Sequence, residues 1–429
     1  MKTMCRWLAG FAYSSLLVLL VPAYLARLWW RGRAEPLYRT ALGERLGHHR
    51  GAGSTGCVWV HAVSLGETRA ASALVDAMRA LCPGMRLLLT HSTATGREAG
   101  RALLREGDVQ AWLPFDTPAA VRRFLRHFRP AIGVLMETEV WPNLLRAAQA
   151  QRVPMVLANA RLSERSLRRG LRFDSVIRPA VESLAAVLAQ TEADAQRLRR
   201  AGGRAVSVVG NLKYDLAPDA GQLARGRAWR DALQRQVVLV ASSREGEEGP
   251  LLACWAAVPQ PRPLLLLVPR HPQRFDAVEA LVREAGLSLV RRSAWVDMPS
   301  AEAARVDVWL GDSMGEMAMY YACAGVALLG GSFAPLGGQN LIEAAACGCP
   351  VVMGPYTFNF AQAAELALSE GAALRVADSG AGVAQAVSLL GDAARREAAV
   401  SHSLAFAARH RGAAARMAAQ IDSSIAPSG

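Results

Sequence analysis

Short runs of almost uninterrupted apolar residues, separated by helical patterns, recur along most of this chain. A strand that is covered on both faces needs no polar alternation, so such runs indicate a parallel sheet with helices on either side. The first series of runs covers residues 58–62, 86–90, 131–136, 154–158, 185–189 and 205–209. The second series covers residues 237–242, 264–268, 306–310, 326–329 and 351–353. We therefore predict an α/β fold of two doubly wound, Rossmann-like halves in tandem.

The two series also divide the chain, whose 429 residues suit two domains of about 200 residues each. Residues 216–236 interrupt the pattern, and we predict an interdomain link there. The other predicted segments are a membrane anchor over 1–30, an N-terminal domain over 31–215 and a C-terminal domain with terminal helices over 237–429. Ligands of such folds bind at the carboxyl ends of the strands, so we expect the site in a cleft that both halves face.

The N-terminal residues 7–26 carry no charge, and their number is about what a helix needs to cross a bilayer core. Trp29 and Trp30 follow at a depth that suits the membrane interface. Lys2 and Arg6 precede the segment and more arginines follow it, which places the body of the protein on the cytoplasmic side. The arginines that follow are Arg27, Arg31, Arg33, Arg39 and Arg45.

A cleaved signal peptide is the alternative interpretation of this segment, but no small-x-small cleavage site follows it. Pro22, Tyr13 and Tyr24 leave open whether the helix spans the bilayer or lies in one leaflet. We predict an uncleaved anchor, either single-pass or monotopic.

The formal net charge of +13 favours polyanionic partners such as nucleic acid, an anionic membrane surface or phosphorylated substrates. All but two of the 49 basic residues are arginines, and Lys213 is the one lysine in the interior of the sequence. The arginines form two runs, Arg122, Arg123, Arg126 and Arg129, and Arg161, Arg165, Arg168, Arg169 and Arg172. Such runs are usually solvated helix faces, but beside an anchor they favour anionic lipid or substrate phosphates. No nucleic-acid-binding module accompanies them, so we expect no nucleic-acid partner.

The seven cysteines are scattered and form no C-x-x-C pair, which argues against a disulfide framework or a zinc site. The G-x-G-x-x-G, Walker A and H-E-x-x-H patterns are absent as well. The sequence therefore gives no support to a dinucleotide, P-loop or zincin site.

In the first half, Glu67 follows a predicted strand and falls in the first turn of a helix. A carboxylate in that place can take a proton from a substrate hydroxyl. The spacing Ser64-x-x-Glu67 is also that of a capping box, in which the glutamate only satisfies backbone N–H groups. The spacing alone does not choose between a general base and a cap.

Two further motifs in the first half hold candidates for chemistry. Glu137 and Glu139 come directly after a predicted buried strand, although both would also suit a helix N-terminus. Lys213 lies in Gly210-Asn211-Leu212-Lys213-Tyr214-Asp215, just before the predicted link, where it can meet a developing negative charge. The alternative for Lys213 is an ordinary surface lysine.

Three motifs of the second half also follow predicted strands. Pro269 and Arg270 come after the strand at 264–268, and the arginine suits a phosphate or carboxylate unless it belongs to an ordinary proline-rich turn. The other two motifs are a strand-to-helix turn with Met314, Gly315 and Glu316, and a glycine-rich loop from residue 330 that leads to Asn340, Leu341, Ile342 and Glu343. A glycine loop before a helix start lets the backbone approach a phosphate, and Glu343 can hold ribose hydroxyls.

Together these motifs resemble the 3-deoxy-D-manno-octulosonic acid (Kdo) transferases of lipopolysaccharide synthesis. The resemblance rests on stretches in the same order, namely HAVSLGE (61–67), METEVWPN (136–143), NARLSERS (159–166), GNLKYD (210–215), VPRHPQRF (268–275), SMGEM (313–317) and GGSFAPLGGQNLIEAAACGCPVVMGP (330–355). It extends from the anchor to about residue 360, and no residue departs from the family pattern within these motifs.

The resemblance implies a two-domain GT-B glycosyltransferase at the bacterial inner membrane that transfers Kdo from CMP-Kdo to a lipid A precursor, with inversion and with no metal or cofactor. The N-terminal half would bind the acceptor and the C-terminal half the donor. Glu67 would be the general base, and Glu137 and Lys213 would stabilise the transition state. CMP would be held by Pro269, Arg270, Met314, Gly315, Glu316, Asn340, Leu341, Ile342 and Glu343.

Two other enzyme classes and one non-enzymatic function remain as alternatives, because a fold does not fix a function. A GT-B transferase could use a UDP-sugar, and sugar-nucleotide epimerases can share the two-half architecture without needing an anchor. A membrane scaffold would account for the anchor and the basic faces, but not for the motifs at the strand ends.

Overall fold

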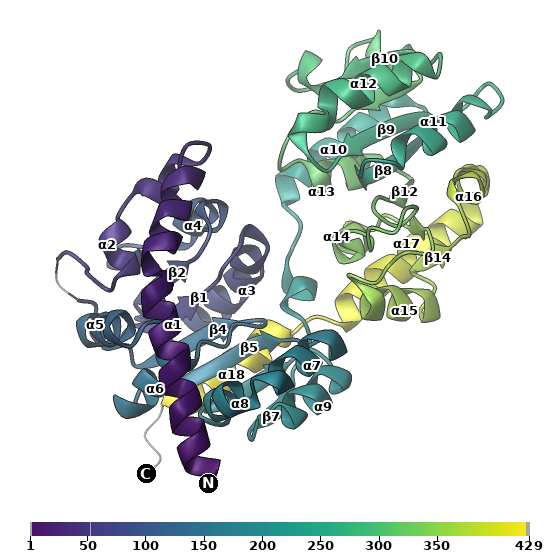
Figure 1. Ribbon diagram of the computed structural model, residues 1–429. Helices are drawn as coiled ribbons and strands as arrows, with labels where there is room; N and C mark the ends of the chain where they lie inside the picture. The colour runs from purple at the N-terminus through teal and green to yellow at the C-terminus, as the bar shows by residue number, and fades with distance from the viewer. Residues whose placement is uncertain (1, 52, 426–429) are drawn as a thin grey trace. The chain divides into compact units, whose positions relative to one another are not determined.

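The computed structural model describes residues 2–51 and 53–425 and divides into two compact units (Figure 1). The first unit comprises Met1–Leu216 and Arg411–Gly429, and the second comprises Ala217–His410. Each unit holds one seven-stranded sheet in which all paired strands are parallel. The prediction of two doubly wound α/β halves is therefore confirmed.

The first sheet has the strand order β3-β2-β1-β4-β5-β6-β7. Its strands are β1 Val58–His61, β2 Leu87–His91, β3 Val109–Trp112, β4 Ile132–Met136, β5 Met155–Ala160, β6 Ala186–Ala189 and β7 Val206–Val208. Buried apolar side chains of one strand belong alternately to two separate core clusters, as Trp59 and Val60 of β1 do. Both faces of the sheet are therefore covered, which explains why the strand sequences are nearly all apolar.

The first unit also contains a set of helices. They are α1 Lys2–Arg31, α2 Leu42–Arg45, α3 Leu65–Leu81, α4 Ala94–Gly100, α5 Pro118–Phe128, α6 Pro142–Ala150, α7 Glu164–Arg172, α8 Asp174–Glu182, α9 Glu192–Arg200 and α18 Ala413–Ile425. Among them, α5 begins at Pro118, which suits the first helical position, and its apolar stripe with Phe124 and Phe128 faces the core.

The second sheet has the strand order β10-β11-β9-β8-β12-β13-β14. Its strands are β8 Val237–Ser243, β9 Leu264–Pro269, β10 Leu289–Arg291, β11 Val308–Leu310, β12 Val326–Leu329, β13 Val351–Met353 and β14 Ala373–Arg375. The accompanying helices are α10 Ala220–Leu233, α11 Glu248–Ala256, α12 Phe275–Glu284, α13 Met317–Cys323, α14 Leu341–Ala346, α15 Ala361–Ser369, α16 Ser379–Gly391 and α17 Ala393–Arg409.

The segment boundaries differ from the predicted ones in two places. Most of residues 216–236, expected as a link, belong to α10 at Ala220–Leu233. The Asp219 side chain caps this helix, and its Trp229 is fully buried against other tryptophans of the second unit. The last helix, expected in the C-terminal domain at 237–429, belongs to the first unit, where α18 packs against α3 and buries Met417 and Ile421. The polar sequence around Pro218 and the alanine-rich sequence of α18 do not reveal these burial partners.

The N-terminal helix α1 lies along the first unit and contacts α8 (Figure 1). The Tyr13 hydroxyl donates to Asp116 Oδ2 at 2.9 Å, and the Ser14 hydroxyl donates to Asn143 Oδ1 at 2.8 Å. The helix α1 also exposes large apolar side chains, among them Trp7, Phe11 and Leu19. By length and composition residues Arg6–Arg31 could cross a membrane, which by itself is weak evidence for an anchor.

Candidate functional site

The carboxyl ends of β1 and β4 lie side by side in the first sheet, because β1 pairs with both β2 and β4. The strand order reverses at this point, and doubly wound sheets bind their ligands in the crevice that opens there. Glu67 follows β1 in the first turn of α3, and Glu137 follows β4 directly. The structure thus brings two of the predicted residues to the switch point of the sheet.

Glu67 makes the contacts of a helix cap. Its Oε2 accepts from the Val63 N–H at 2.8 Å, and its own N–H donates to Ser64 Oγ at 3.4 Å. Burial also raises the pKa of Glu67 to about 7, with smaller contributions from the charges of Glu137 and Glu139. A carboxylate with such a pKa exchanges a proton near neutral pH, so capping and general-base roles are compatible at this residue.

Glu137 is held in an uncommon backbone conformation at the end of its strand. Its φ is +57°, a left-handed value that costs a non-glycine residue of order 1 kcal/mol or more. A hydrogen bond of 2.9 Å from the Glu137 N–H to Ala158 O keeps the backbone in register with β5. The side chain is 6% exposed and pairs with Arg161 Nε at 2.7 Å.

Lys213 joins the same group of charges from a short 3-10 helix, Leu212–Asp215, that follows β7. Burial lowers its pKa, while the charges of Glu137 and Glu67 favour its protonated form and that of Arg161 opposes it. The segment is tied to the sheet because Asn159 Oδ1 accepts from the Leu212 N–H at 3.1 Å. Lys213 is therefore no ordinary surface lysine, and all three residues predicted to act in catalysis lie in one cluster.

Two further residues of this cluster were not predicted as site residues. Arg161 pairs with Glu137, and buried Asn159 holds the segment before Lys213. Glu139, which the sequence offered as a candidate together with Glu137, also acts on the charge of Glu67, and burial raises its pKa. Asn159 has a φ of +51°. The position of Asn159 and Arg161 at the end of a buried strand was the available signal, but the arginine-rich background hid Arg161.

In the second unit, Pro269 ends β9 and Arg270 is exposed just beyond it. The Glu316 carboxylate pairs with the buried Arg292 at 3.0 Å and accepts from the Tyr320 hydroxyl at 3.1 Å. Met314 is 62% exposed on the same turn. Glu316 therefore fastens this turn within its unit, whereas Arg270 and Met314 present side chains to solvent.

The glycine-rich loop after β12 leads into α14. Asn340 caps this helix through its side chain, which accepts from the Ile342 N–H at 3.2 Å, and Glu343 lies in the first turn. Leu341 and Ile342 are 1% exposed, so any contribution of these two positions to a ligand comes from the backbone rather than the side chains.

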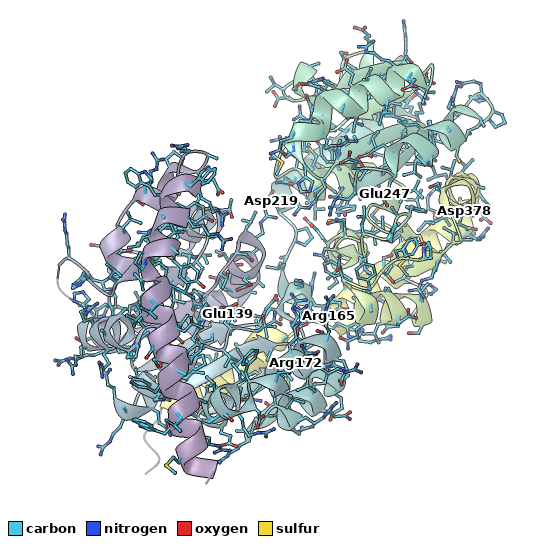
Figure 2. All side chains as sticks on the ribbon, in the orientation of Figure 1. Glu139, Arg165, Arg172, Asp219, Glu247 and Asp378 are labelled. Carbon is cyan, nitrogen blue, oxygen red and sulfur yellow. The ribbon has the colours of Figure 1, made fainter. Side chains whose placement is uncertain are left out.

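Glu247 organises this loop and was missed by the sequence analysis. Its side chain lies at the start of α11, 1% exposed, among the strand ends of the second unit (Figure 2). Oε2 accepts from the Gly331 N–H at 2.6 Å and Oε1 from the Phe333 N–H at 2.9 Å. The backbone N–H groups of Arg244 and Ala334 donate to the same carboxylate. A glutamate among several in Arg244-Glu245-Gly246-Glu247-Glu248 carries no sequence signal for this role.

A comparison of the whole chain with characterised proteins decides the family. It is 49% identical over 413 residues to the 3-deoxy-D-manno-octulosonic acid transferase of Bordetella pertussis, a match that covers 92% of this chain and 95% of that protein. The chain therefore belongs to the Kdo transferase family. The Haemophilus influenzae Kdo transferase is 33% identical over 361 residues, with 82% of this chain and 83% of that protein covered. The family model described as Kdo transferase matches residues 40–216.

Among solved structures, this member of the Kdo transferase family is similar to Alr3699/HepE from Anabaena in complex with UDP-glucose. The TM-score is 0.57 at 17% identity, over 86% of this chain and 99% of that one. At that identity the similarity concerns the fold alone, and it agrees with the GT-B type that the sequence predicted. The predicted family, fold class and glycosyltransferase activity are thus confirmed.

Proposed function

We propose that this Kdo transferase uses CMP-Kdo as donor and a lipid A precursor as acceptor, and that it acts by direct displacement with inversion. The observation that carries the proposal is the group of Glu67, Glu137 and Lys213 around the switch point of the first sheet. A base, a second carboxylate and a cation in one buried place are what activation of a hydroxyl and stabilisation of charge require.

In the proposed reaction, Glu67 takes the proton of the acceptor hydroxyl. The oxygen then attacks the anomeric carbon of Kdo while the bond from that carbon to the CMP phosphate breaks, and CMP leaves as an anion. Lys213 stabilises the charge that develops during the transfer, and Glu137, held by Arg161, keeps this cation protonated. Because the attack and the departure occur on opposite sides of the carbon, the configuration inverts.

The second unit is proposed to bind CMP through the predicted residues at its strand ends. Arg270 is exposed beyond β9 and suits a phosphate, and the glycine loop that Glu247 holds presents backbone close to α14. Glu343 in the first turn of α14 is the candidate for the ribose hydroxyls. Cationic side chains then offset the charge of the leaving phosphate, which is how transfer proceeds without a metal in this proposal.

The test is a transfer assay with purified protein, a CMP-Kdo generating system and tetraacylated lipid A precursor, with the lipid products weighed by mass spectrometry. We expect a gain of one or more Kdo masses. Protection of the protein by CMP but not by UDP would argue against a UDP-sugar as donor. Consumption of the lipid acceptor would argue against an epimerase, which needs none. If well-folded, membrane-reconstituted protein adds no Kdo, the proposed donor and acceptor are wrong.

The pH dependence of the transfer is expected to follow Glu67. Since burial raises its pKa to about 7, the base is mostly protonated below that pH and mostly ionised above it. We expect kcat/KM for the acceptor to fall about tenfold per pH unit below 7 and to level off above. If kcat/KM showed no such change between pH 6 and 8, Glu67 would not be the base.

We further propose that α1 is a monotopic anchor in the inner membrane, with the body on the cytoplasmic side. The bonds from Tyr13 to Asp116 and from Ser14 to Asn143 tie the middle of the helix to the first unit. A spanning arrangement would break them or draw Asp116 and Asn143 into hydrocarbon. The exposed apolar side of α1 suits one leaflet whose anionic lipids match the basic body.

Labelling distinguishes the two arrangements of α1. In a Met4→Cys variant with Cys5→Ser, we expect an impermeant maleimide to label position 4 only after spheroplasts are opened, because both ends of a monotopic helix stay on the cytoplasmic side. Exposed Cys82 of the body is the internal control. Labelling of position 4 but not of Cys82 in intact spheroplasts would show a single-pass anchor instead.

A further inference from the structure

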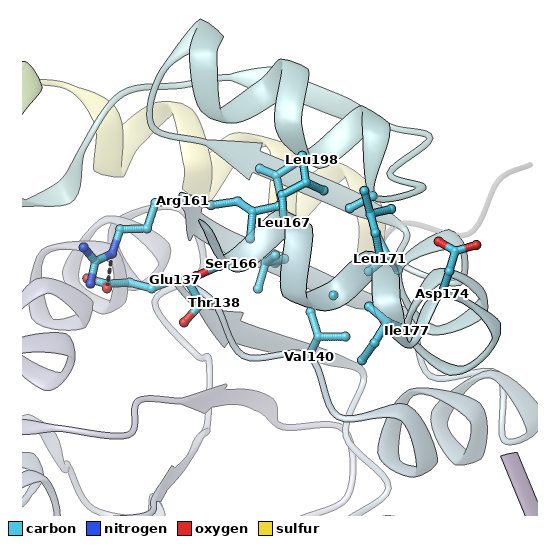
Figure 3. Close-up of a pocket in the computed structure, with 15 residues that line it drawn as sticks. Glu137, Thr138, Val140, Arg161, Ser166, Leu167, Leu171, Asp174, Ile177 and Leu198 are labelled. Carbon is cyan, nitrogen blue, oxygen red and sulfur yellow. Dashed lines mark hydrogen bonds and ion pairs between the residues drawn. The ribbon is translucent and has the colours of Figure 1, made fainter. Parts of the chain in front are cut away.

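An apolar slot opens beside Glu137 in the first unit (Figure 3). Glu137, Thr138 and Arg161 form its polar end, and the apolar side chains extend away from that end beneath α7. Leu167 of α7 lines the slot, and the remaining walls come from β5, α8 and α9, whose side chains include Leu157, Ile177, Val181 and Leu198.

The slot has the size and lining of a site for a hydrocarbon chain. Its volume is about 70 Å³. That corresponds to roughly five water-sized positions, and cavities with apolar walls stay dry and take up apolar ligands. The one carboxylate at the far end, Asp174, pairs with Arg178 at 2.9 Å, so it is neutralised within α8.

The mouth of the slot is also suited to a lipid. Leu171 on the slot wall is 38% exposed and the adjacent Phe173 is 68% exposed. Gly170 leaves open space beside it, because a Cβ at this position would meet no atom within 4 Å. Arg165 and Arg172 extend from α7 (Figure 2), and their charge complements phosphates on a lipid whose chain enters here.

The position of the slot relates it to both the chemistry and the anchor. Its polar end is the same Glu137 that belongs to the catalytic cluster. Its wall α8 packs against α7 and also against the apolar helix α1. A glycolipid with its sugar at the cluster would therefore have an apolar path at the point where its chains begin.

We propose that this slot binds one acyl chain of the lipid acceptor and so makes transfer depend on acyl length. The inference rests on the proposed function and deepens it, because it assigns a specificity site beside the reacting sugar. The occupant is a fatty acyl chain rather than a membrane protein, since the slot holds only about 70 Å³ and most of the side chains that line it are apolar.

The test compares acceptors that differ only in acyl length, presented in the same mixed micelles. For the unmodified protein, kcat/KM should fall about fourfold for each methylene removed from the slot, which follows from burial of about 0.8 kcal/mol per CH₂. Ile177→Phe fills the slot from α8 and should raise the KM for long-chain acceptor about tenfold. The KM for the short-chain acceptor and the KM for CMP-Kdo should each change less than twofold.

Two variants keep the interpretation independent of folding. Ile177→Ala widens the slot and should move the preference toward longer chains, whereas Val208→Phe adds the same bulk at a half-exposed position of β7 outside the slot and should change nothing. If the unmodified protein transfers Kdo and Ile177→Phe depends on acyl length in the same way, the proposal of the slot is wrong but the proposed function stands. Absence of transfer to every acceptor would overturn the proposed function and the slot's occupant with it.

Discussion

Glu67→Gln is expected to lower kcat for Kdo transfer by about 10²–10⁴-fold, because the amide cannot accept the proton of the acceptor hydroxyl. The substitution keeps the cap, since glutamine serves at this position of a capping box and its oxygen can still accept from the Val63 N–H. The melting temperature of the Glu67→Gln protein and its KM for CMP-Kdo should therefore stay close to those of the unmodified protein. The residual activity of this variant should no longer show the fall of kcat/KM below pH 7.

Ser64→Ala is the matched control for this prediction. It removes the hydroxyl that accepts from the Glu67 N–H, and loss of such a cap costs about 1 kcal/mol of stability. The carboxylate stays in place, so transfer should change by only a few fold. If Ser64→Ala lost as much activity as Glu67→Gln, the glutamate would act through the helix start rather than as a base.

Glu247→Gln is expected to have the largest effect on the second unit. The carboxylate accepts from four backbone N–H groups, two at each oxygen, and the amide would turn an N–H₂ group toward two of these donors. Leaving a buried donor unsatisfied costs about 1–3 kcal/mol, so for two donors we expect a loss of about 2–6 kcal/mol. With the glycine loop no longer held, the KM for CMP-Kdo should rise at least tenfold.

Chemical denaturation followed by tryptophan fluorescence measures the stability part, since Trp229, Trp295 and Trp309 form one cluster within the same unit. Glu245→Gln is the control, because that side chain is 84% exposed two residues earlier and should leave both quantities unchanged. A Glu247→Gln protein with unchanged stability and an unchanged donor KM would mean that the loop keeps its form without the carboxylate.

Periodicity predicted the central strands because their sequences are apolar on both faces, as in β4 and β12. It missed β3, β10 and β14, three of the four edge strands of the two sheets, which carry polar or half-exposed residues. At a sheet edge fewer neighbours bury the side chains, so the sequence there lacks the continuous apolar run by which the other strands were predicted.

The site was predictable where a residue type is unusual for its position. Lys213 is nearly alone among arginines, and Glu67 and Glu137 are carboxylates directly after apolar strands. Glu247 was not predictable, since its role depends on where a loop more than eighty residues later brings its backbone N–H groups. Leu341 and Ile342 were predicted from the motif to hold CMP, but their side chains are buried and pack in the core. A motif can therefore include residues whose side chains serve packing.

The return of α18 to the first unit makes that unit discontinuous in sequence, with the second unit inserted between its parts. During synthesis the second unit can therefore be complete while the first still lacks the helix that covers α3. Met417 and Ile421 emerge from the ribosome only after the whole second unit, and until then the apolar surface of α3 that they cover is open to water. The first unit, rather than the second, is therefore the one whose apolar core cannot be completed until α18 has been synthesised.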